Sequence, residues 1–333
     1  MKTSLLEQPL PARIAAHQSE RISKQARHRR KLDRLAGISL SLLACLPVFI
    51  LVAIIIALGL RARPILENAS LWMLLSSETW RPLHGEFGFY PFIIGTLWVT
   101  GVAMFLAVPP ALLSAIYLAE YARPRTRAMT KPIIDLLAAI PSVVYGVWGV
   151  IVIVPWVQRF IAPLLSRWLG TWPLFAKQNP TGFGVLSGGV VLAVMVVPFI
   201  VSVSYEVMQA IPSGLREASL ALGATHWQTI KHALIPQALP GVAAGVVFGA
   251  SRALGETMAV LMVVGNVVQV PHSIFDAAYP LPALIANNYG EMLSIPLYDA
   301  ALLAAALVLL LIVLVFNIIS TLILRRIIRS THR

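Results

Sequence analysis

Residues 241–268 read GVAAGVVFGASRALGETMAVLMVVGNVV, a run long enough to cross a bilayer that carries only two charges, Arg252 and Glu256. An ionisable side chain in the middle of a membrane helix costs about 2.5 to 3.5 kcal/mol, so such residues usually face a pathway or a partner. At about 100° per residue, both charges share the side of a continuous helix that carries a small-residue stripe. The run therefore predicts either a charged pair on a substrate path or a buried ion pair that fixes helix register. The stripe predicts close packing against a second helix; it consists of Gly241, Gly245 and Gly249.

The composition excludes an ordinary water-soluble domain. Of the 333 residues, 58% are hydrophobic and only 12% are charged, whereas soluble domains average about 25% charged residues. The single cysteine, Cys45, lies in an apolar segment, so no intramolecular disulfide or thiol metal site is expected. A net charge of +12 would suggest nucleic acid in a soluble protein, but here the positive residues gather at the ends of apolar segments. We therefore expect an all-helical, polytopic protein that contacts membrane lipid and no nucleic acid.

Six apolar segments divide the chain between two basic tails, 1–36 and 325–333. The second segment contains Pro109 and Pro110, which predict a kink or a break. A semi-polar loop, 208–237, separates the fourth and fifth segments. The six segments are predicted to be transmembrane helices at 37–60, 92–119, 133–157, 184–207, 238–268 and 297–324.

The distribution of basic residues predicts the orientation. Six spans put both termini on one side of the membrane. That side holds nine Lys and Arg in the N-terminal tail, four at 123–131, two at 216 and 231 and four after 324, against six on the other side. The positive-inside rule therefore places both termini in the cytoplasm.

The loop after the fourth span predicts a docking element. Pro212 and Ser213 can start a helix and Gly223 can end it. Leu215, Ala218 and Leu222 share one face of that helix. A short amphipathic helix between two spans suits a partner's groove, although a helix lying on the membrane surface fits the same spacing.

This loop resembles the cytoplasmic motif of permease subunits of ATP-binding-cassette (ABC) importers. Ser219 replaces the second Ala of that motif and Ile235 replaces a Leu, which are small or apolar exchanges. The resemblance implies that the loop is the coupling helix to a separate ATPase. The residues that occupy the motif's positions are Glu217, Ala218, Ser219, Gly223, Ile235 and Pro236.

Further segments narrow the resemblance to PstC-type phosphate permeases. The run 251–260, SRALGETMAV, followed by Gly265 and Asn266, looks like the signature of that family. The segments 86–92, 95–97, 116–121 and 140–149 agree with it, so the resemblance extends from about residue 80 to the end. It implies a type I ABC importer fold in the bacterial inner membrane, a second permease, an ATPase dimer and an extracytoplasmic phosphate-binding protein. It also implies that this chain holds no cofactor, since the partner ATPase binds ATP and magnesium.

Arg252 connects this resemblance with physical chemistry. A guanidinium offers a planar fork of donors that matches two oxygens of phosphate. Glu256 could pair with Arg252 when the path is empty. Two alternatives stay open: a permease for another oxyanion, such as molybdate or sulfate, and a membrane enzyme that acts on lipid-linked phosphates.

No catalytic or metal-binding constellation stands out in the sequence. His84, His226 and His232 lack a second ligand at metal spacing. Nor does the sequence contain a phosphate-cradling loop of the Gly-x-x-x-x-Gly-Lys-Ser type. Glu120 and Asp135 are interpreted as solvated residues at helix ends.

Overall fold

The computed structural model describes residues 10–68, 70–176, 179–290, 295 and 297–331, with the backbone alone for 10–33, 68 and 327–331. The chain forms two compact units, 1–57 and 58–333. The first unit contains most of helix α1 (Leu10–Asn68), which continues into the second unit. Most of the basic side chains of the tail predicted at 1–36 therefore lie outside the described residues.

Among the described residues, six helical segments are long and apolar enough to cross a membrane, as the sequence predicted. Three of them closely follow the predicted bounds: Tyr90–Tyr121, Val185–Gln209 and Tyr298–Arg326. The first is longer than predicted, at Arg34–Glu67. Pro109 and Pro110 do not break α3 (Tyr90–Ile116), which continues through both residues. The helix α14 (Tyr298–Thr331) also extends into the predicted C-terminal tail.

The third span differs from the prediction, lying at Ser142–Leu169 instead of 133–157. Ile140 and Pro141 have extended backbone angles and separate α4 (Pro124–Ala139) from α5 (Ser142–Trp148). The ring of a proline clashes with the residue before it and disfavours the helical conformation there. This clash at Ile140 explains the break. The span then continues through α6 (Val154–Trp156) and α7 (Ala162–Leu169), with two π-helical turns, η3 (Gly149–Ile153) and η4 (Val157–Ile161).

The fifth span also differs, because the run 238–268 is not one helix. The span begins earlier, at α10 (His226–Thr229), and continues through the π-helical turn η6 (Ile230–Leu234) and α11 (Ile235–Leu254). It stops at Gly255, and a separate short helix, α12 (Met258–Val263), follows. Glycine is a poor helix former, which favours an interruption at this point.

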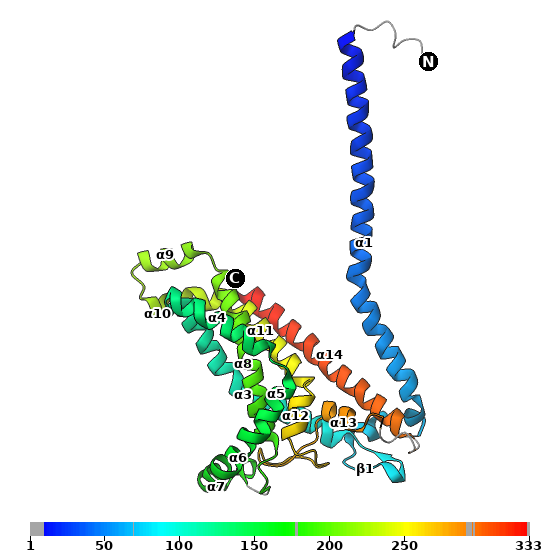
Figure 1. The fold of residues 1–333 in the computed structure, drawn as a ribbon, viewed down its shortest axis with the longest axis vertical. Coiled ribbons are helices and arrows are strands. Elements are labelled where there is room, and N and C mark those ends of the chain that lie inside the picture. Colours follow the sequence, from blue (N-terminus) through cyan, green and yellow to red (C-terminus); the bar gives the residue numbers. More distant parts are fainter. Residues whose placement is uncertain (1–9, 69, 177–178, 291–294, 296, 332–333) are drawn as a thin grey trace. The chain divides into compact units, whose positions relative to one another are not determined.

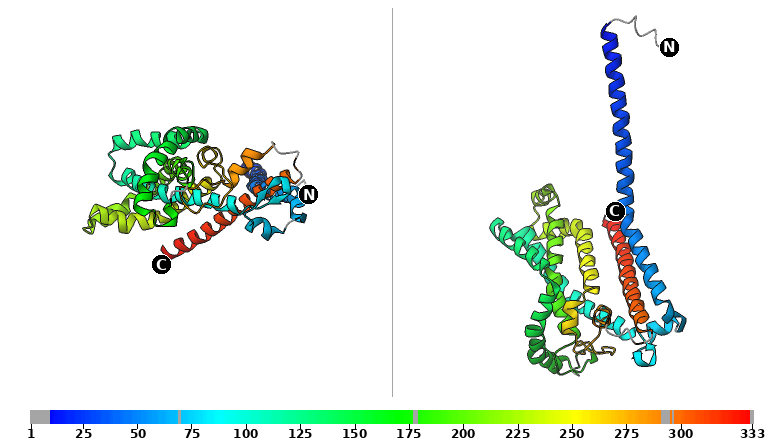
Figure 2. Two further views of the ribbon diagram at one scale, coloured as in Figure 1. Left: turned by 90° about the horizontal axis from the view of Figure 1, so that it is seen from below. Right: turned by 45° about the vertical axis from the view of Figure 1, so that its right-hand side comes forward.

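Helix α8 (Val185–Gln209) is the centre of the second unit. It packs against α3, α4 and α11 (Figure 1). Most of its residues are buried. Helix α14, the red helix in Figure 2, lies along one edge of the bundle. It packs on α11 and on α13 (Leu281–Asn288). A second apolar core lies at the end of the bundle that carries α2 (Leu71–Ser76) and the hairpin of β1 (Trp80–Arg81) and β2 (Glu86–Phe87). Two 3₁₀ turns, Pro82–His84 and Pro173–Phe175, complete the elements.

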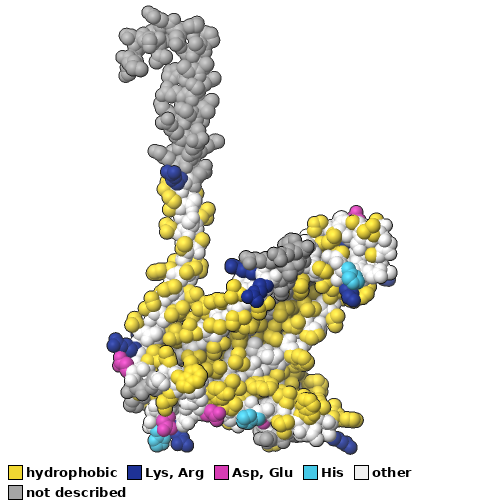
Figure 3. Space-filling model, turned by 180° about the vertical axis from the view of Figure 1, so that it is seen from behind, with side chains coloured by type: hydrophobic (Ala, Val, Ile, Leu, Met, Phe, Trp, Pro, Cys, Tyr) yellow, Lys and Arg dark blue, Asp and Glu magenta, His cyan; other side chains and the backbone are white. Residues whose placement is uncertain are grey.

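The surface of the second unit fits a membrane protein. A broad hydrophobic band crosses the face drawn in Figure 3, and coloured charged side chains gather at its margins. The helix α9 (Ser213–Ala221), the start of α4 and the C-terminal end of α14 lie at the same end of the bundle (Figure 1). This arrangement is the one expected if those three segments face one membrane side.

Candidate functional site

The predicted coupling loop is a projecting pair of short helices. None of the residues of α9 is buried, and Leu222 at its end is 90% exposed. Glu217 and Ala218 are exposed on α9, while Ile235 and Pro236 begin α11. Gly223 turns the chain with a φ of +83°, in the left-handed region that favours glycine. The apolar face predicted for docking is therefore left uncovered by the described residues.

A capping box fixes the second helix of the loop. The side chain of Thr225 accepts a hydrogen bond from the backbone N–H of Gln228, and the Gln228 side chain accepts one from the Thr225 N–H. The hydroxyls of Ser219 and Thr229 lie 2.9 Å apart and join α9 to α10. Ser219 therefore contributes a contact that the Ala usual in the motif could not make.

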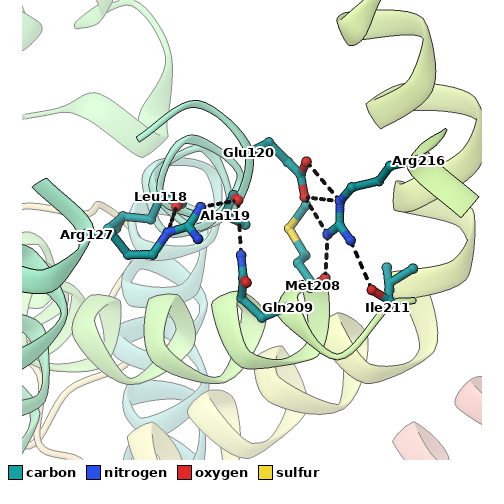
Figure 4. Close-up of polar contacts among 8 residues, drawn as sticks. All are labelled: Leu118, Ala119, Glu120, Arg127, Met208, Gln209, Ile211 and Arg216. Carbon is teal, nitrogen blue, oxygen red and sulfur yellow. Dashed lines mark hydrogen bonds and ion pairs between the residues drawn. The ribbon is translucent and has the colours of Figure 1, made fainter. Parts of the chain in front are cut away.

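Glu120 and Arg216 form an ion pair at the root of the loop. Nη2 of Arg216 lies 2.8 Å from Oε1 of Glu120, and Nε lies 3.2 Å from Oε2. The guanidinium also donates to the backbone carbonyls of Ile211 and Met208 (Figure 4). The Glu120 side chain is only 4% exposed. The interpretation of Glu120 as a solvated helix-end residue is therefore wrong.

Glu120 belongs to a π-helical turn, η2 (Tyr117–Tyr121), that ends the second span. Arg127 donates to the carbonyls of Leu118, at 3.1 Å, and Ala119, at 2.6 Å. Gln209 also donates to the Ala119 carbonyl, at 3.0 Å (Figure 4). Carbonyls at the end of a helix need such partners when water is scarce. Side chains from α4 and α8 thus cap the second span.

A charged cluster joins α4 to α8. Nζ of Lys131 lies 2.8 Å from Asp135, 3.0 Å from Glu206 and 2.7 Å from the Ser202 hydroxyl. The Lys131 hydrogen bond lowers the pKa of Asp135; burial opposes this effect, and the Ser202 hydroxyl supports it. Burial alone would lower the pKa of Lys131, but hydrogen bonds and charges from Asp135 and Glu206 raise it. Asp135 is therefore a partner of Lys131, although its side chain remains 48% exposed, in keeping with the predicted solvated position.

The glycine stripe of α11 lies against α8. A Cβ atom added at Gly241 would lie 2.6 Å from Val207, and one at Gly245 would lie 2.8 Å from Val203. At Gly249 the nearest atoms, from Ile200 and Val196, would be 3.0 Å away. These distances are shorter than ordinary van der Waals contact, so only glycine permits this approach of the two helices.

Arg252 and Glu256 do not pair. Arg252 is exposed near the end of α11, and within the described part of the chain it has no hydrogen-bond or ion-pair partner. Glu256 follows the break at Gly255 and accepts a hydrogen bond from the Ala259 N–H, at 3.3 Å. The prediction that both charges turn toward the packed side is wrong for Arg252. The helix is interrupted between the two residues, so they are not one turn apart on a common face.

Two other sides of α11 are covered by neighbouring helices. The glycine stripe lies on α8, and the Ser251 hydroxyl donates to Asn317 of α14 at 3.0 Å. Phe248, one turn before Arg252, is exposed as well. Arg252 therefore marks the one side of α11 on which the described residues leave both an aromatic ring and a cation uncovered.

The comparison with protein families identifies the type of chain. The family model described as "Binding-protein-dependent transport system inner membrane component" matches residues 111–329. The chain belongs to this family of membrane transport permeases. It is thus a multi-pass inner membrane protein and a transport subunit rather than an enzyme.

Curated relatives cover most of this permease. The "Phosphate transport system permease protein PstC" of Haemophilus influenzae is 36% identical over 289 residues, which are 86% of this chain and 91% of the relative. The "Probable phosphate transport system permease protein PstC" of Methanocaldococcus jannaschii is 32% identical over 302 residues, 89% of this chain and 95% of the relative. The resemblance to PstC-type permeases found in the sequence is thereby confirmed.

Solved structures support the fold. The permease matches a chain of a bacterial ABC transporter involved in the import of alginate with a TM-score of 0.51 at 20% identity, over 72% of this chain and 79% of that one. It matches a chain of the MetNI methionine ABC transporter with a TM-score of 0.50 at 23% identity, over 70% and 93% of the chains. The predicted all-helical importer-permease fold is confirmed.

Sequence reasoning missed the contacts at the root of the coupling loop. A weak signal was present: Glu120 is an acidic residue at the end of a long apolar run, and Arg216 lies on the opposite side of α9 from Ala218. Their partnership spans 96 positions in the chain, so spacing could not reveal it.

Proposed function

We propose that this permease imports inorganic phosphate across the bacterial inner membrane. The names of its relatives in Haemophilus influenzae and Methanocaldococcus jannaschii support this substrate. The proposed assembly pairs the chain with a second, related permease and couples it to an ATPase dimer. An extracytoplasmic binding protein delivers phosphate, and the partner ATPase, not this chain, binds ATP and magnesium.

The observation that carries the proposal is the unpaired guanidinium of Arg252. The sides of α11 toward α8 and α14 are covered, whereas Arg252 and Phe248 remain uncovered by described residues. A cation without a partner in a membrane span is costly unless it serves a path or a partner. A single guanidinium can bind two phosphate oxygens without holding the ion too tightly for release. In this proposal the uncovered side of α11 faces the second permease across the path.

The break at Gly255 gives Glu256 a separate role. Its carboxylate stabilises the first turn of α12 by accepting the Ala259 N–H. A negative charge beyond the end of α11 would repel an anion that has passed Arg252. In this proposal Glu256 shapes the path after Arg252 without pairing with it.

The orientation is proposed as both termini in the cytoplasm, with α9 and α10 docked on the ATPase. The exposed apolar face of α9 and the strong excess of Lys and Arg on this side support it. A reporter fused after Arg125 or at the C-terminus should behave as cytoplasmic, and one near Lys177 as external. Lys177 itself lies outside the described residues. Access to Lys177 from the cytoplasm alone would refute the orientation.

Phosphate uptake by Arg252 variants tests the function. In membrane vesicles that contain the whole transporter, Arg252→Gln should nearly abolish uptake, while Arg252→Lys should retain part of it because charge survives without the planar fork. Arg63→Gln is the matched control, since Arg63 is an exposed cation that, among the described residues, pairs with Glu67 one turn away. Competition by sulfate and molybdate reports on the selectivity for phosphate.

The double variant Arg252→Gln with Glu256→Gln separates a path residue from a structural pair. Because the two side chains do not touch, removing both charges should leave uptake as low as in Arg252→Gln. Uptake near the parent level in the double variant would remove Arg252 from the path.

A further inference from the structure

The coupling helix α9 is attached to the bundle at few points. None of its residues is buried, so apolar packing does not hold it. Among the described residues, its side chains make hydrogen bonds across to other elements from two positions, Arg216 and Ser219. Ser219 reaches only the next helix of the same loop. Arg216 is therefore the side chain that ties α9 to a transmembrane span.

The contact made by Arg216 is short and largely closed to water. The Arg216 side chain is 23% exposed and the Glu120 side chain 4% exposed. Three nitrogen–oxygen distances between them lie between 2.8 and 3.3 Å. An ion pair in such a setting is strongly directional, and removing one partner leaves an uncompensated buried charge. The remaining guanidinium hydrogens bind the carbonyls of Met208 and Ile211, where α8 leads into α9.

The turn that carries Glu120 is connected in three directions. Arg216 reaches it from α9, Arg127 from α4 and Gln209 from α8 (Figure 4). These side chains act on three consecutive residues, Leu118 to Glu120, of a π-helical turn. A displacement of α9 therefore reaches the end of the second span through a chain of short polar contacts.

We propose that Arg216 and Glu120 are positioning residues for transport: their ion pair carries the movement of the coupling helix into the second span through the π-helical turn η2. The inference rests on the proposed function in one respect, that α9 is the docking element of the ATPase. Beyond that function, it names the two side chains that transmit the movement of the docked helix to a transmembrane span. Arg216 and Glu120 contact neither the substrate nor ATP in this scheme.

The experiment uses the whole transporter in proteoliposomes and measures phosphate taken up per ATP hydrolysed. Arg216→Gln should lower this ratio at least about five-fold, the lower end of typical coupling effects, while the ATPase still co-purifies. Arg216→Lys should retain part of the ratio, because it keeps the charge and loses the fork. The matched control is Lys131→Met, which breaks another interhelical ion pair at this end of the bundle without touching α9. Lys131→Met should lower thermal stability and leave the ratio unchanged.

A double variant, Glu120→Leu with Arg216→Gln, separates transmission from simple stabilisation. It leaves no buried charge, and the new amide can still donate toward the Met208 or Ile211 carbonyl. Assembly and stability should recover relative to the single variants, while the uptake ratio stays low. Recovery of the ratio together with stability would overturn the proposal.

A second readout does not depend on the transported anion. Hydrogen exchange of the backbone amides is compared between the nucleotide-free and ATP-bound complexes. In the parent, exchange should change both in 213–221 and in 117–121; in the double variant, only in 213–221. An equal change of exchange at 117–121 in both proteins would refute transmission through the ion pair of Arg216 and Glu120. This outcome would count even if the parent transported another ion. Failure of the parent to take up phosphate would instead refute the proposed substrate.

Discussion

Replacing Gly241 by alanine should force α11 away from α8. The added Cβ atom would lie 2.6 Å from one γ-methyl carbon of Val207, 2.8 Å from the other and 3.3 Å from its Cβ. Rotating the valine about χ1 can move only one of the two methyl groups away, so the side chain cannot clear the contact by itself. The helices must therefore separate over this turn.

The expected magnitude follows from two opposing effects. Overpacking a tight contact costs about 1 to 3 kcal/mol. Alanine in place of glycine inside a helix stabilises the fold by about 0.5 to 1 kcal/mol, because glycine loses more backbone entropy. The net loss for Gly241→Ala should be about 0 to 2.5 kcal/mol. The loss should be smaller at Gly245, where Val203 would lie at 2.8 and 3.2 Å, and smallest at Gly249, where the nearest atoms lie at 3.0 Å.

Thermal unfolding of the detergent-solubilised protein measures this order. Gly101→Ala on α3 is the control, because a Cβ at that position would meet nothing within 4 Å. It should be neutral or slightly stabilising. Adding Val207→Ala to Gly241→Ala should recover more stability than the separate effects predict, since the two side chains contact each other. Unfolding of Gly241→Ala at the same temperature as Gly101→Ala would contradict a tight contact between α11 and α8 at this position.

Two further predictions concern the coupling loop and the charged cluster. Gly223→Val should reduce the ATPase that co-purifies with the permease, because a β-branched residue is strained at a φ of +83°; Gly223→Asn should be tolerated, as should Gly214→Ala, whose Cβ would meet nothing within 4 Å. Equal loss in Gly223→Asn would show that strain is not the cause. Lys131→Met should lower the free energy of unfolding by about 0.5 to 1 kcal/mol, the range for partly exposed pairs. Because the pKa of Asp135 is lowered in the folded protein, Asp135 contributes fully to the free energy of unfolding above its unfolded pKa, about 3.9. This contribution is lost as pH falls through the lower pKa of the folded state. Because the pKa of Lys131 is raised in the folded protein, Lys131 contributes fully to the free energy of unfolding below its unfolded pKa, about 10.4. This contribution is lost as pH rises through the higher pKa of the folded state. The stability difference between Lys131→Met and the parent should thus be constant from about pH 6 to 9, and a steep change within that range would contradict the assignment.

The sequence by itself determined the number of spans, the family and the packing side of α11. Apolar length is a local property, because every backbone group in a bilayer must be paired within its own helix. The glycine stripe is also readable, since a repeat of four residues defines one helix face. The motif around Glu217 and Gly223 located the loop between the fourth and fifth spans.

The tertiary structure alone decided where the spans end and which charges meet. Hydropathy did not resolve the breaks at Pro141 and Gly255, because apolar residues continue on both sides of each. The second break separates Arg252 from Glu256, a pair that a continuous helix would have placed together. Glu120 and Arg216 lie 96 positions apart and meet only because the second span and α9 converge at one end of the bundle. Long-range contacts of this kind depend on how helices pack, and no periodicity in a single sequence encodes them.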